Sequence, residues 1–567
     1  MIETANDLTE VEGIKARSSH LRGTLVDSLN NPLTGAIADD DTQVSKFHGI
    51  YQQDDRDIRQ IRKRQRLEPA YSFMIRARVP GGVCSTAQWL NMDAIATTRA
   101  NGTIRLTTRQ AFKLHGVIKG ELKPAIQGIN KAMMDTLAAC GDVNRNVMCS
   151  PMPPLSETHR EVQAQAESLS RHLTPATTAY HEIWLDGKKL QESKPEVEPI
   201  YGDTYLPRKF KLAFVVPPQN DVDVYSQDLG FIAIVEDGKL SGYNVTVGGG
   251  MGMSHGEAET YPRLGDVLGF CVPSQVTSVA EAVVTTQRDF GDRTNRKHAR
   301  LKYTIDDRGL DWFRGEIEQR LGWTLEDSRP FAFVGNGDVY GWQQSADGLW
   351  HYTLFVQNGR IQDHDGIELM SGLRRIAMLH KGDFRLTPNQ NLIICNVADG
   401  DRARITGLLR HFRIENSERA TPLRLHSLAC VAFPTCGLAM AESERYLPSL
   451  VDRIERLLVS HGLRDEAITI RMTGCPNGCA RPYIAEIGLV GKAPGRYNLY
   501  LGAGFMGERL NRLHRENVNE EEILDALDPL LARFANERTD NEHFGDFVVR
   551  IGTVAAVRAG KDFHHAA

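Results

Sequence analysis

Two short motifs each occur twice in this chain of 567 residues, and the copies follow one another in the same order. Residues 102–110 and 382–390 both read G-x-x-R-L-T-x-x-Q. Residues 243–250 and 497–504 both read Y-N-x-x-x-G-x-G, and both lead into a Met-Gly pair. The order A, B, A′, B′ indicates a duplicated unit that folds with pseudo-twofold symmetry. We expect a functional site between the halves, where one copy of each element faces the other.

The local patterns predict a mixture of α and β structure around more than one core, because 567 residues exceed what a single core holds. Residues 468–472 alternate apolar and polar side chains, as a half-buried strand does. Apolar residues recur at helical spacing from Leu450 to Leu458, and Gly462 supplies a stop signal. Residues 1–50 are polar with isolated apolar positions, so we expect an arm that orders against another part of the chain or against a partner.

Charge and hydropathy argue against several classes of function. Lys plus Arg number 67 and Asp plus Glu number 72, so the net charge of −5 gives no support for nucleic-acid binding. The first 20 residues are polar and lack the apolar stretch of a secretory signal. No uninterrupted apolar run approaches the roughly 18 residues that span a bilayer. We therefore expect a soluble, cytoplasmic protein with no membrane and no nucleic-acid partner.

Nine cysteines are too few for a disulfide framework, and their odd number argues against full pairing. Cys430 and Cys436 form a C-x₅-C arm, and Cys475 and Cys479 form a C-x₃-C arm within T-G-C-P-N-G-C. Four thiolates suit an iron–sulfur cluster, because soft sulfur ligands match iron–sulfide cores. A structural zinc site is the alternative, but zinc sites usually use C-x₂₋₄-C knuckles, which a C-x₅-C arm does not provide. After Cys436 we expect a helix, whose N-terminal field would favour a thiolate.

In its cysteine arms and its repeats, the chain resembles the sirohaem-dependent sulfite and nitrite reductase family over nearly its whole length. The resemblance implies an α+β (mixed α/β) fold, with pseudo-twofold duplicated ferredoxin-like and sirohaem/cluster-binding domains in the order A-B-A′-B′. It implies a [4Fe–4S] cluster on the four cysteines, and it makes the Cys479 sulfur the axial ligand of the sirohaem iron as well. The expected divisions are an N-terminal arm for partner contact at 1–50, ferredoxin-like half-domains at 51–135 and 340–420, a first sirohaem-binding domain at 136–330 and a cluster-carrying domain at 421–567.

The resemblance also assigns roles to basic residues that the sequence alone would leave as surface charges. Those expected to bind and protonate the substrate are Arg76, Arg145, Lys209 and Lys211. Those expected to hold the carboxylates of sirohaem, together with Asn477, are Arg105, Arg109, His115, Arg208, Arg296, Arg300 and Lys302. The lysines at 209 and 211 alternate as on a strand, which would place both ammonium groups on one face. Lys113 occupies a position that we associate with a neutral amide in the family, and its role stays open.

For function, the resemblance implies the six-electron reduction of sulfite to sulfide in sulfate assimilation and cysteine biosynthesis. Residues 47–59, which contain Y-Q-Q-D-D-R-D-I-R, resemble haemoproteins that receive electrons from NADPH through a separate flavoprotein (alpha) subunit carrying FAD and FMN. The chain itself shows no motif for a flavin or for NADPH, so we expect a hetero-oligomer. Two alternatives stay open: a ferredoxin-dependent sulfite or nitrite reductase of the same fold, and a non-catalytic iron–sulfur protein.

Overall fold

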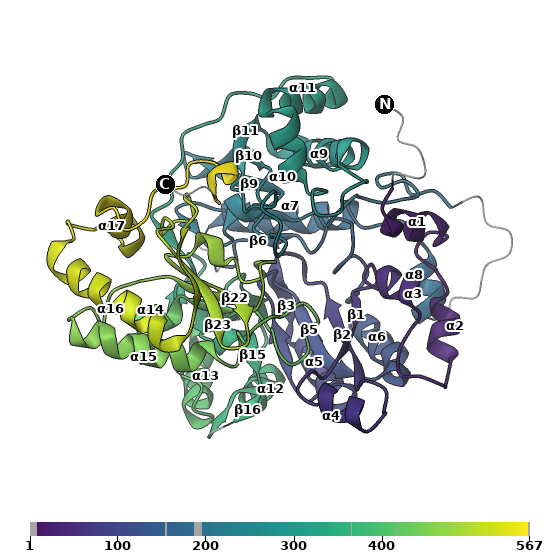
Figure 1. The fold of residues 1–567 in the computed structure, drawn as a ribbon, viewed down its shortest axis with the longest axis horizontal. Helices are drawn as coiled ribbons and strands as arrows, with labels where there is room; N and C mark the ends of the chain where they lie inside the picture. Colours follow the sequence, from purple (N-terminus) through teal and green to yellow (C-terminus); the bar gives the residue numbers. More distant parts are fainter. Residues whose placement is uncertain (1–7, 153–155, 186–195, 365, 416, 565–567) are drawn as a thin grey trace.

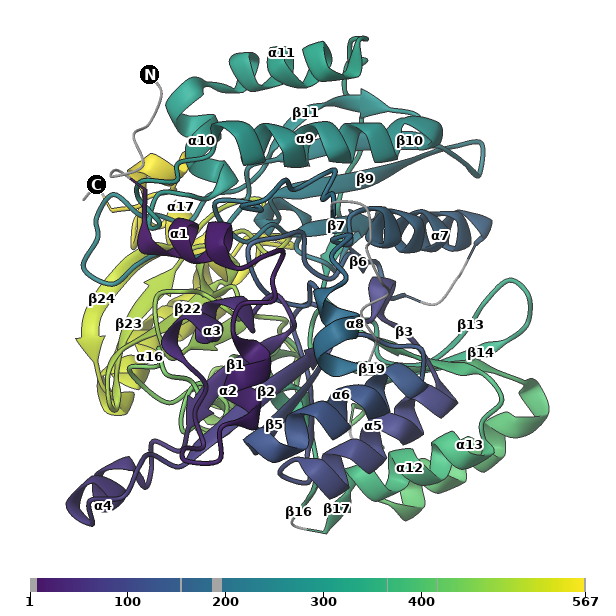
Figure 2. The ribbon, with the colours of Figure 1, turned by 90° about the vertical axis from the view of Figure 1, so that its right-hand side faces the viewer.

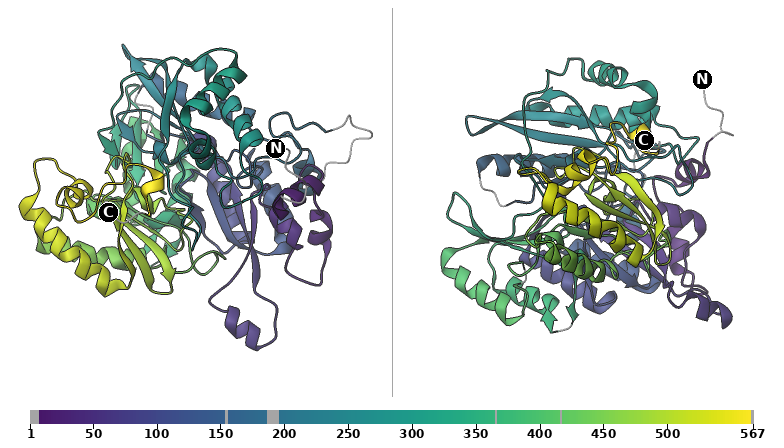
Figure 3. Two further views of the ribbon diagram at one scale, coloured as in Figure 1. Left: turned by 45° about the horizontal axis from the view of Figure 1, so that its top comes forward. Right: turned by 60° about the vertical axis from the view of Figure 1, so that its left-hand side comes forward.

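The computed structural model describes residues 8–152, 156–185, 196–364, 366–415 and 417–564. Within these residues, strands form four five-stranded sheets that helices cover (Figure 1). Two sheets belong to the A units and two to the B units, so the mixed α/β fold expected from the sequence is observed. Figure 3 shows the N-terminal arm and the C-terminal helices on opposite sides of the molecule. In this described part, no helix is long and apolar enough to cross a membrane.

The two A-type sheets exchange a strand with each other. β3 lies in the first half of the chain yet pairs with β18, and β15 lies in the second half yet pairs with β4. The first sheet, in spatial order, consists of Ile50–Asp54 (β1), Tyr71–Ala77 (β2), Phe112–Val117 (β5), Ile104–Leu106 (β4) and Arg360–Ile361 (β15). The second consists of Gly341–Gln344 (β13), Trp350–Leu354 (β14), Leu392–Val397 (β19), Asp383–Leu386 (β18) and Val83–Ser85 (β3).

The first repeated motif forms the same turn in both halves. It joins β4 to β5 in one copy and β18 to β19 in the other. The backbone N–H groups of Thr107 and Thr387 each close the turn on a carbonyl further along it, at 3.1 Å and 3.0 Å. Gln110 and Gln390 both adopt a positive φ, of 49° and 69°. Matching backbone geometry in the two copies supports the duplicated A unit.

The two B-type sheets repeat one topology, in which two parallel pairings are followed by two antiparallel ones. The first consists of Met148–Cys149 (β6), Leu212–Val215 (β7), Leu229–Glu236 (β9), Lys239–Val247 (β10) and Asp266–Cys271 (β11). The second consists of Ser427–Ala429 (β20), Ile470–Thr473 (β21), Ile487–Ala493 (β22), Arg496–Leu501 (β23) and Arg512–Val518 (β24). The Tyr-Asn pair of the second motif lies on β10 and again on β23, so the order A-B-A′-B′ is observed.

Helices of the two A units pack together beneath their sheets, as Figure 2 shows. They are Thr86–Arg99 (α5), Leu122–Lys131 (α6), Leu369–Leu379 (α12) and Asp399–His411 (α13). A capping box starts α5, because the backbone N–H of Gln88 donates to Ser85 Oγ at 3.1 Å and that of Ser85 donates to Gln88 Oε1 at 2.9 Å. Arg374 on α12 donates to Asp93 on α5 at 3.2 Å, which ties the two units together.

The remaining elements are short or belong to the B units. The helices are Arg59–Arg64 (α4), Glu157–His172 (α7), Ala179–Trp184 (α8), Val276–Phe290 (α9), Leu301–Arg308 (α10), Leu310–Leu321 (α11), Pro422–Leu425 (α14), Leu447–Ser460 (α15), Glu520–Glu537 (α16) and Phe544–Arg550 (α17). Two-residue strands pair as Gln219–Asn220 (β8) with Gly335–Asn336 (β12), and as Asp363–His364 (β16) with Ile367–Glu368 (β17).

Two local predictions in the last unit have different outcomes. The helix predicted around Leu450 is α15, and Gly462 follows it with a φ of 72°. The strand predicted at 468–472 exists as β21, but its four residues are all buried, so the half-buried assignment was wrong. Its polar face is covered by the other half of the molecule, where Arg471 pairs with Asp223 at 2.7 Å.

The helix expected after Cys436 is absent, and α15 begins only at Leu447. The backbone N–H groups of Met440 and Ala441 instead donate to Gly474 O, at 2.7 Å and 3.2 Å. These bonds hold the segment against the neighbouring cysteine loop, so its donors are not available for a helical ladder. The prediction was wrong because this tertiary contact has no local signal in the sequence.

The N-terminal arm orders against the first half of the chain. Its helices are Glu10–Arg17 (α1), Leu25–Asn30 (α2) and Asp39–Val44 (α3). Lys15 is fully buried, and its ammonium group donates to Glu12 at 2.5 Å and to Leu206 O at 2.8 Å. Arg293 donates to the same Glu12 carboxylate. A role of this arm in partner contact, and the proposed limits of each unit, stay predictions.

At the junction of the halves, two equivalent turn residues of opposite charge meet. Asp223 and Arg481 each precede a short 3-10 turn, with φ values of 49° and 55°. The Arg481 guanidinium donates to the Asp223 carboxylate, and Arg471 on β21 donates to it at 2.7 Å. Burial alone would raise the pKa of Asp223, but the two arginines lower it to about 2. This carboxylate therefore balances two buried cations.

Replacing Asp223 with Ala should destabilise the protein by about 3–5 kcal/mol, because two buried guanidinium groups lose their counter-charge. The free energy of unfolding from a denaturant titration measures this. Asp40→Ala removes the partly exposed pair of Arg17 with Asp40, and it should change stability by less than about 1 kcal/mol. Equal effects of the two variants would contradict the importance of Asp223.

Candidate functional site

Two loops that follow neighbouring parallel strands carry the four cysteines. Cys430 follows β20 and Cys475 follows β21, so the parallel pairing of these strands brings both loops to one edge of the sheet. The backbone N–H of Cys430 donates to Met472 O at 3.2 Å, and that of Gly474 donates to Cys430 Sγ at 3.3 Å. The sheet itself therefore positions both cysteine arms.

The four sulfur atoms lie close enough to influence one another. Burial raises the pKa of Cys430 to about 11 and that of Cys475 to about 12, and the Cys479 thiol is the next cause in both. Burial and then Cys479 also raise the pKa of Cys436. Cys479 is the exposed member of the four, so its sulfur is accessible to a second group.

The donor set fits an iron–sulfur cluster better than a single metal ion. Within the described residues, no three His, Cys, Asp or Glu side chains converge closely enough to hold one ion. An iron–sulfur core is larger, since each thiolate binds a different iron atom. The Gly474 N–H and Asn477 Nδ2, which lies 3.6 Å from Cys475 Sγ, supply the hydrogen bonds to sulfur that tune such clusters.

Arg56 holds the Cys436 loop from outside, although sequence reasoning gave it no role. Its Nη1 donates to Cys436 O at 3.0 Å and to Ala439 O at 2.6 Å. Its guanidinium lies 4.4 Å from the centroid of the Phe433 ring. Arg56 lies within the Y-Q-Q-D-D-R-D-I-R segment, which was the available signal.

Basic residues assigned to the substrate come together beside the cysteine loops. Burial, followed by Arg208 and Arg145, lowers the pKa of Lys209 well below its usual value. Burial also lowers the pKa of Lys211, and Arg109 is the next cause. Neither lysine forms an ion pair with a carboxylate in the part of the chain that is described. The two ammonium groups thus lie in a strongly positive environment.

The alternation of these two lysines predicted a strand that carries both, and the structure places them next to one. Phe210 between them forms an isolated bridge with Asn144, and β7 begins at Leu212. The lysines therefore lie just before the strand rather than on it.

Lys113 links the cation cluster to the cysteine loops. It pairs across the sheet with Arg76, whose Nη1 donates to Cys140 Sγ at 3.2 Å. Burial, followed by the neighbouring arginines, lowers the pKa of Lys113 to about 7, while the thiols of Cys436 and Cys479 act in the opposite direction. The structure therefore gives Lys113 a place between the two parts of the site, which the sequence could not assign.

Several polar atoms in the cluster are buried and have no hydrogen-bond partner among the described residues. They include Nε of Arg76, Nε of Arg109 and both ring nitrogens of His115. Burial, followed by Lys113, lowers the pKa of His115 far below its usual value, so the ring is neutral. Unpaired donors and cations are costly to bury unless an anion joins them. These residues therefore fit sirohaem, whose carboxylates need cations and N–H donors, together with a small anionic substrate.

Apart from its Nε, Arg109 has partners within the protein, because its Nη1 donates to Gln227 Oε1 at 2.8 Å and its Nη2 to Asn146 O at 2.7 Å. Other residues assigned to sirohaem are bonded as well. Arg105 donates to Glu444 at 2.7 Å and to Ala429 O at 2.8 Å. Asp142 lies 2.8 Å from Arg296 and 4.0 Å from Arg208, and Asp228 lies 2.8 Å from Arg300. Lys302 donates to the carbonyls of Gly250 at 3.1 Å and Gly252 at 2.9 Å. These bonds orient the side chains, and their assignment to sirohaem stays a prediction.

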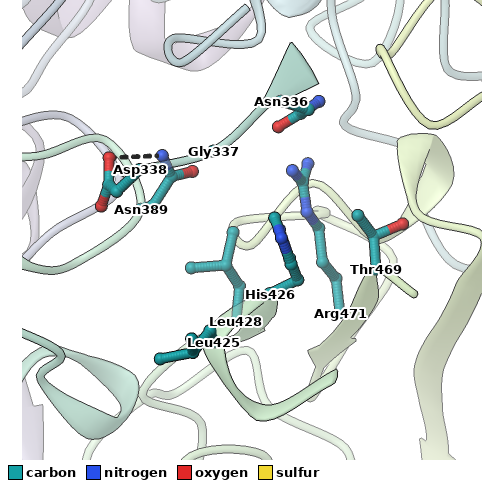
Figure 4. Close-up of a pocket in the computed structure, with 9 residues that line it drawn as sticks. All are labelled: Asn336, Gly337, Asp338, Asn389, Leu425, His426, Leu428, Thr469 and Arg471. Carbon is teal, nitrogen blue, oxygen red and sulfur yellow. Dashed lines mark hydrogen bonds between the residues drawn. The ribbon is translucent and has the colours of Figure 1, made fainter. Parts of the chain in front are cut away.

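The second half contains a counterpart of this region that is closed. In the first motif, Asn389 stands where Arg109 stands in the other copy. Figure 4 shows Asn389 bonded to Asp338, at 3.0 Å, with Arg471 nearby. The cavity here holds about 10 Å³, which is room for about one water molecule. Arg471, the cation that lines this cavity, is paired with Asp223 of the protein itself.

Sequence reasoning missed two residues at the edge of the cation cluster, Lys46 and Tyr51. Tyr51 lies within electrostatic reach of Arg145, and Lys46 Nζ lies 5.7 Å from the centroid of the Tyr51 ring. Burial, followed by Arg296, lowers the pKa of Lys46 to about 8. The polar composition of the N-terminal arm gave no sign that it reaches the site.

Comparison with known proteins finds full-length relatives. The chain is 60% identical over 557 residues to the "Sulfite reductase [NADPH] hemoprotein beta-component" of Oceanobacillus iheyensis, which covers 98% of this chain and 96% of the relative. It is 58% identical over 564 residues to the protein of the same name from Staphylococcus saprophyticus, covering 99% of each. Among solved structures, the Mycobacterium tuberculosis NirA protein matches with a TM-score of 0.77 and 25% identity, over 97% of both chains.

Two family descriptions match different units. The "Nitrite/Sulfite reductase ferredoxin-like half domain" matches residues 65–132 and 343–411, one copy in each A unit. The "Nitrite and sulphite reductase 4Fe-4S domain" matches residues 165–325, in the first B unit, whereas the four cysteines lie in the second. Together with the full-length relatives, these matches show that the chain belongs to the nitrite and sulfite reductase family, as its cysteine spacing and repeats indicated.

Proposed function

We propose that this chain is the haemoprotein (beta) subunit of an NADPH-dependent sulfite reductase, which reduces sulfite to sulfide by six electrons in sulfate assimilation and cysteine biosynthesis. Relatives that cover nearly the whole chain bear that name. The observation that carries the proposal is the group of buried cations without carboxylate partners beside four converging cysteines. All nine cysteines are free, which suits a reducing compartment and supports a cytoplasmic location.

The residues that would hold the cofactors follow from this geometry. Cys430, Cys436, Cys475 and Cys479 would bind the [4Fe–4S] cluster, and the cations around Arg109 would bind the carboxylates of sirohaem. When bound, these groups supply electrons to the substrate one at a time. Cys479 would also ligate the sirohaem iron, and its exposure supports this double role.

The chain's own residues would bind the substrate and deliver its protons. Arg76 and Arg145 can hold oxygen atoms of the substrate through paired N–H donors. Burial and then the neighbouring cations lower the pKa of Lys209 and Lys211, so their ammonium groups are stronger acids than usual and give up a proton readily. Each substrate oxygen needs two protons to leave as water. Nitrite is also a small anion, so its reduction is an expected side activity.

A protruding hairpin next to the cysteine loops supports a separate electron donor. Residues 55–70 join β1 to β2 and contain α4, which buries none of its residues and projects from the body in Figure 2. Its last turn carries Arg62, Lys63 and Arg64. Leu438, two residues after Cys436, has 68% of its surface exposed. We therefore place the flavoprotein subunit, with its FAD and FMN, on this basic and partly apolar surface in a hetero-oligomer.

The proposed function is tested by the spectrum and substrate preference of the purified protein. Made in cells that synthesise sirohaem, it should show haem bands beside the broad absorption of the cluster. With reduced viologen as donor, its kcat/KM for sulfite should exceed that for nitrite. A cluster without haem bands would support a non-catalytic iron–sulfur protein, and the opposite substrate order would support a nitrite reductase. Cys479→Ser should change the haem spectrum, and a native spectrum would contradict its double role.

Lys209→Met should leave both cofactors bound and lower turnover of sulfite by about 100-fold, because it removes a positioned proton donor. Visible spectra report cofactor content, and steady-state kinetics with reduced viologen report turnover. Lys131→Met, at an exposed position at the end of α6, is the control and should match the wild type. Loss of the haem from Lys209→Met would instead make Lys209 a cofactor ligand.

Reversing two charges on α4, in Lys63→Glu/Arg64→Glu, should lower NADPH-driven turnover through the flavoprotein by about tenfold or more, since like charges weaken electrostatic docking. Turnover driven by reduced viologen should stay unchanged, because the small donor needs no docking surface. Both rates are measured on one preparation. A loss of both rates would show damage to the site, and a loss of neither would place the flavoprotein elsewhere.

A further inference from the structure

The segment 45–51, from the end of the N-terminal arm, forms one wall of the cation cluster. The carbonyl of Phe47 accepts a backbone hydrogen bond at 2.7 Å from the loop that carries Arg145. The carbonyl of Gly49 accepts one at 2.9 Å from the backbone N–H of Arg76. Arg76 is thus attached directly to this wall, and the loop that carries Arg145 is attached to it at Ala138.

Within this wall, Lys46 is a half-buried cation whose hydrogen-bond partner is uncharged. Its Nζ donates to Gln43 Oε1 at 2.6 Å and lies 5.7 Å from the centroid of the Tyr51 ring. Tyr51 in turn lies within electrostatic reach of Arg145, whose guanidinium donates to Gly141 O at 3.2 Å. The described residues provide Lys46 with no carboxylate ion pair. Its ammonium group therefore lies next to the predicted substrate ligand without being neutralised.

The charges that face Lys46 are mostly of its own sign. They are those of Arg296, Arg208, Arg145 and Asp142. The single carboxylate among them, that of Asp142, already accepts a hydrogen bond from Arg296 at 2.8 Å. Repulsion from these arginines would favour a conformation in which the lysine extends into solvent. The inward conformation is favourable when an anion binds there. Because Lys46 is partly exposed and lies beside Arg145, an anion arriving from solvent meets it on the way to the inner cations.

We propose that Lys46 is a further substrate-binding residue, the outer cation that captures the oxyanion and passes it to Arg145. This inference rests on the proposed function, because it concerns the same site. Electrostatic attraction raises the rate of encounter according to the charges of both partners. Lys46 therefore favours a dianion, such as sulfite, over a singly charged anion such as nitrite.

The test compares Lys46→Met and Lys46→Arg with the wild type in the full-length protein carrying its cofactors, with reduced viologen as donor and at a pH where sulfite is a dianion. Lys46→Met should lower kcat/KM for sulfite about tenfold and that for nitrite about threefold, because the steering energy scales with substrate charge. The lower kcat/KM should come from a higher KM and not from a lower kcat, and kcat/KM should depend less on salt concentration than in the wild type. Lys46→Arg should restore most of the wild-type value.

The control is Lys239→Met, which removes an exposed lysine from the start of β10 and should change nothing. Loss of haem absorbance from Lys46→Met would overturn the proposal and make Lys46 a cofactor or structural residue. An unchanged KM, or equal losses with sulfite and nitrite, would overturn it as well. A wild-type protein that does not reduce sulfite would instead refute the proposed function, so the two failures are distinguishable.

Discussion

The exchange of one strand between the two A-type sheets is the constraint on which the rest of the structure depends. Because β3 and β15 each cross to the opposite sheet, neither A unit is complete without the other. Of the repeated glutamines, Gln110 crosses the junction, since its Nε2 donates to Leu386 O at 3.0 Å. Gln390 Nε2 donates to Ala429 O at 3.0 Å and ties the A unit of the second half to its B unit. A half on its own would expose an unpaired sheet edge, so the two halves must fold around each other.

Departures from the duplication explain why the cationic site belongs to the first half. Arg109 has Asn389 as its counterpart in the repeated motif, and Lys211 just before β7 has Thr469 just before β21. The Asn389 side chain donates to Asp338 at 3.0 Å and the Thr469 hydroxyl donates to Glu486 at 3.2 Å, and both carboxylates are buried. The neutral donors at these two positions are satisfied by carboxylates of the protein, so the second region has closed. The first keeps cations that the protein does not neutralise, and it stays suited to anions.

Features with a local or repeated signal could be predicted from the sequence, and those that depend on tertiary contacts could not. The two repeated motifs predicted the order of the A and B units, and the spacing of Cys436 and the other three cysteines predicted the two loops that carry them. The helix expected after that residue is missing, because backbone contacts to the neighbouring loop replace it. Arg105 pairs with Glu444, 339 positions away, and no local pattern could indicate this pair. Lys46 could not be predicted for the same reason, since its neighbours come from distant segments.

Asp142 shows how the fold tolerates so many cations around one site. Its carboxylate accepts from Arg296 at 2.8 Å and lies 4.0 Å from Arg208 and 3.9 Å from Lys15 of the N-terminal arm. Burial would raise its pKa, but these cations hold the pKa below its usual value, so the group stays charged. Lys15 has Glu12 as a second partner, whereas the single charge of Asp142 orients both Arg296 and Arg208 and is too little to neutralise the two. The remaining positive charge weakens the empty fold through repulsion and strengthens it once an anion is bound, so folding around this site and anion binding favour each other.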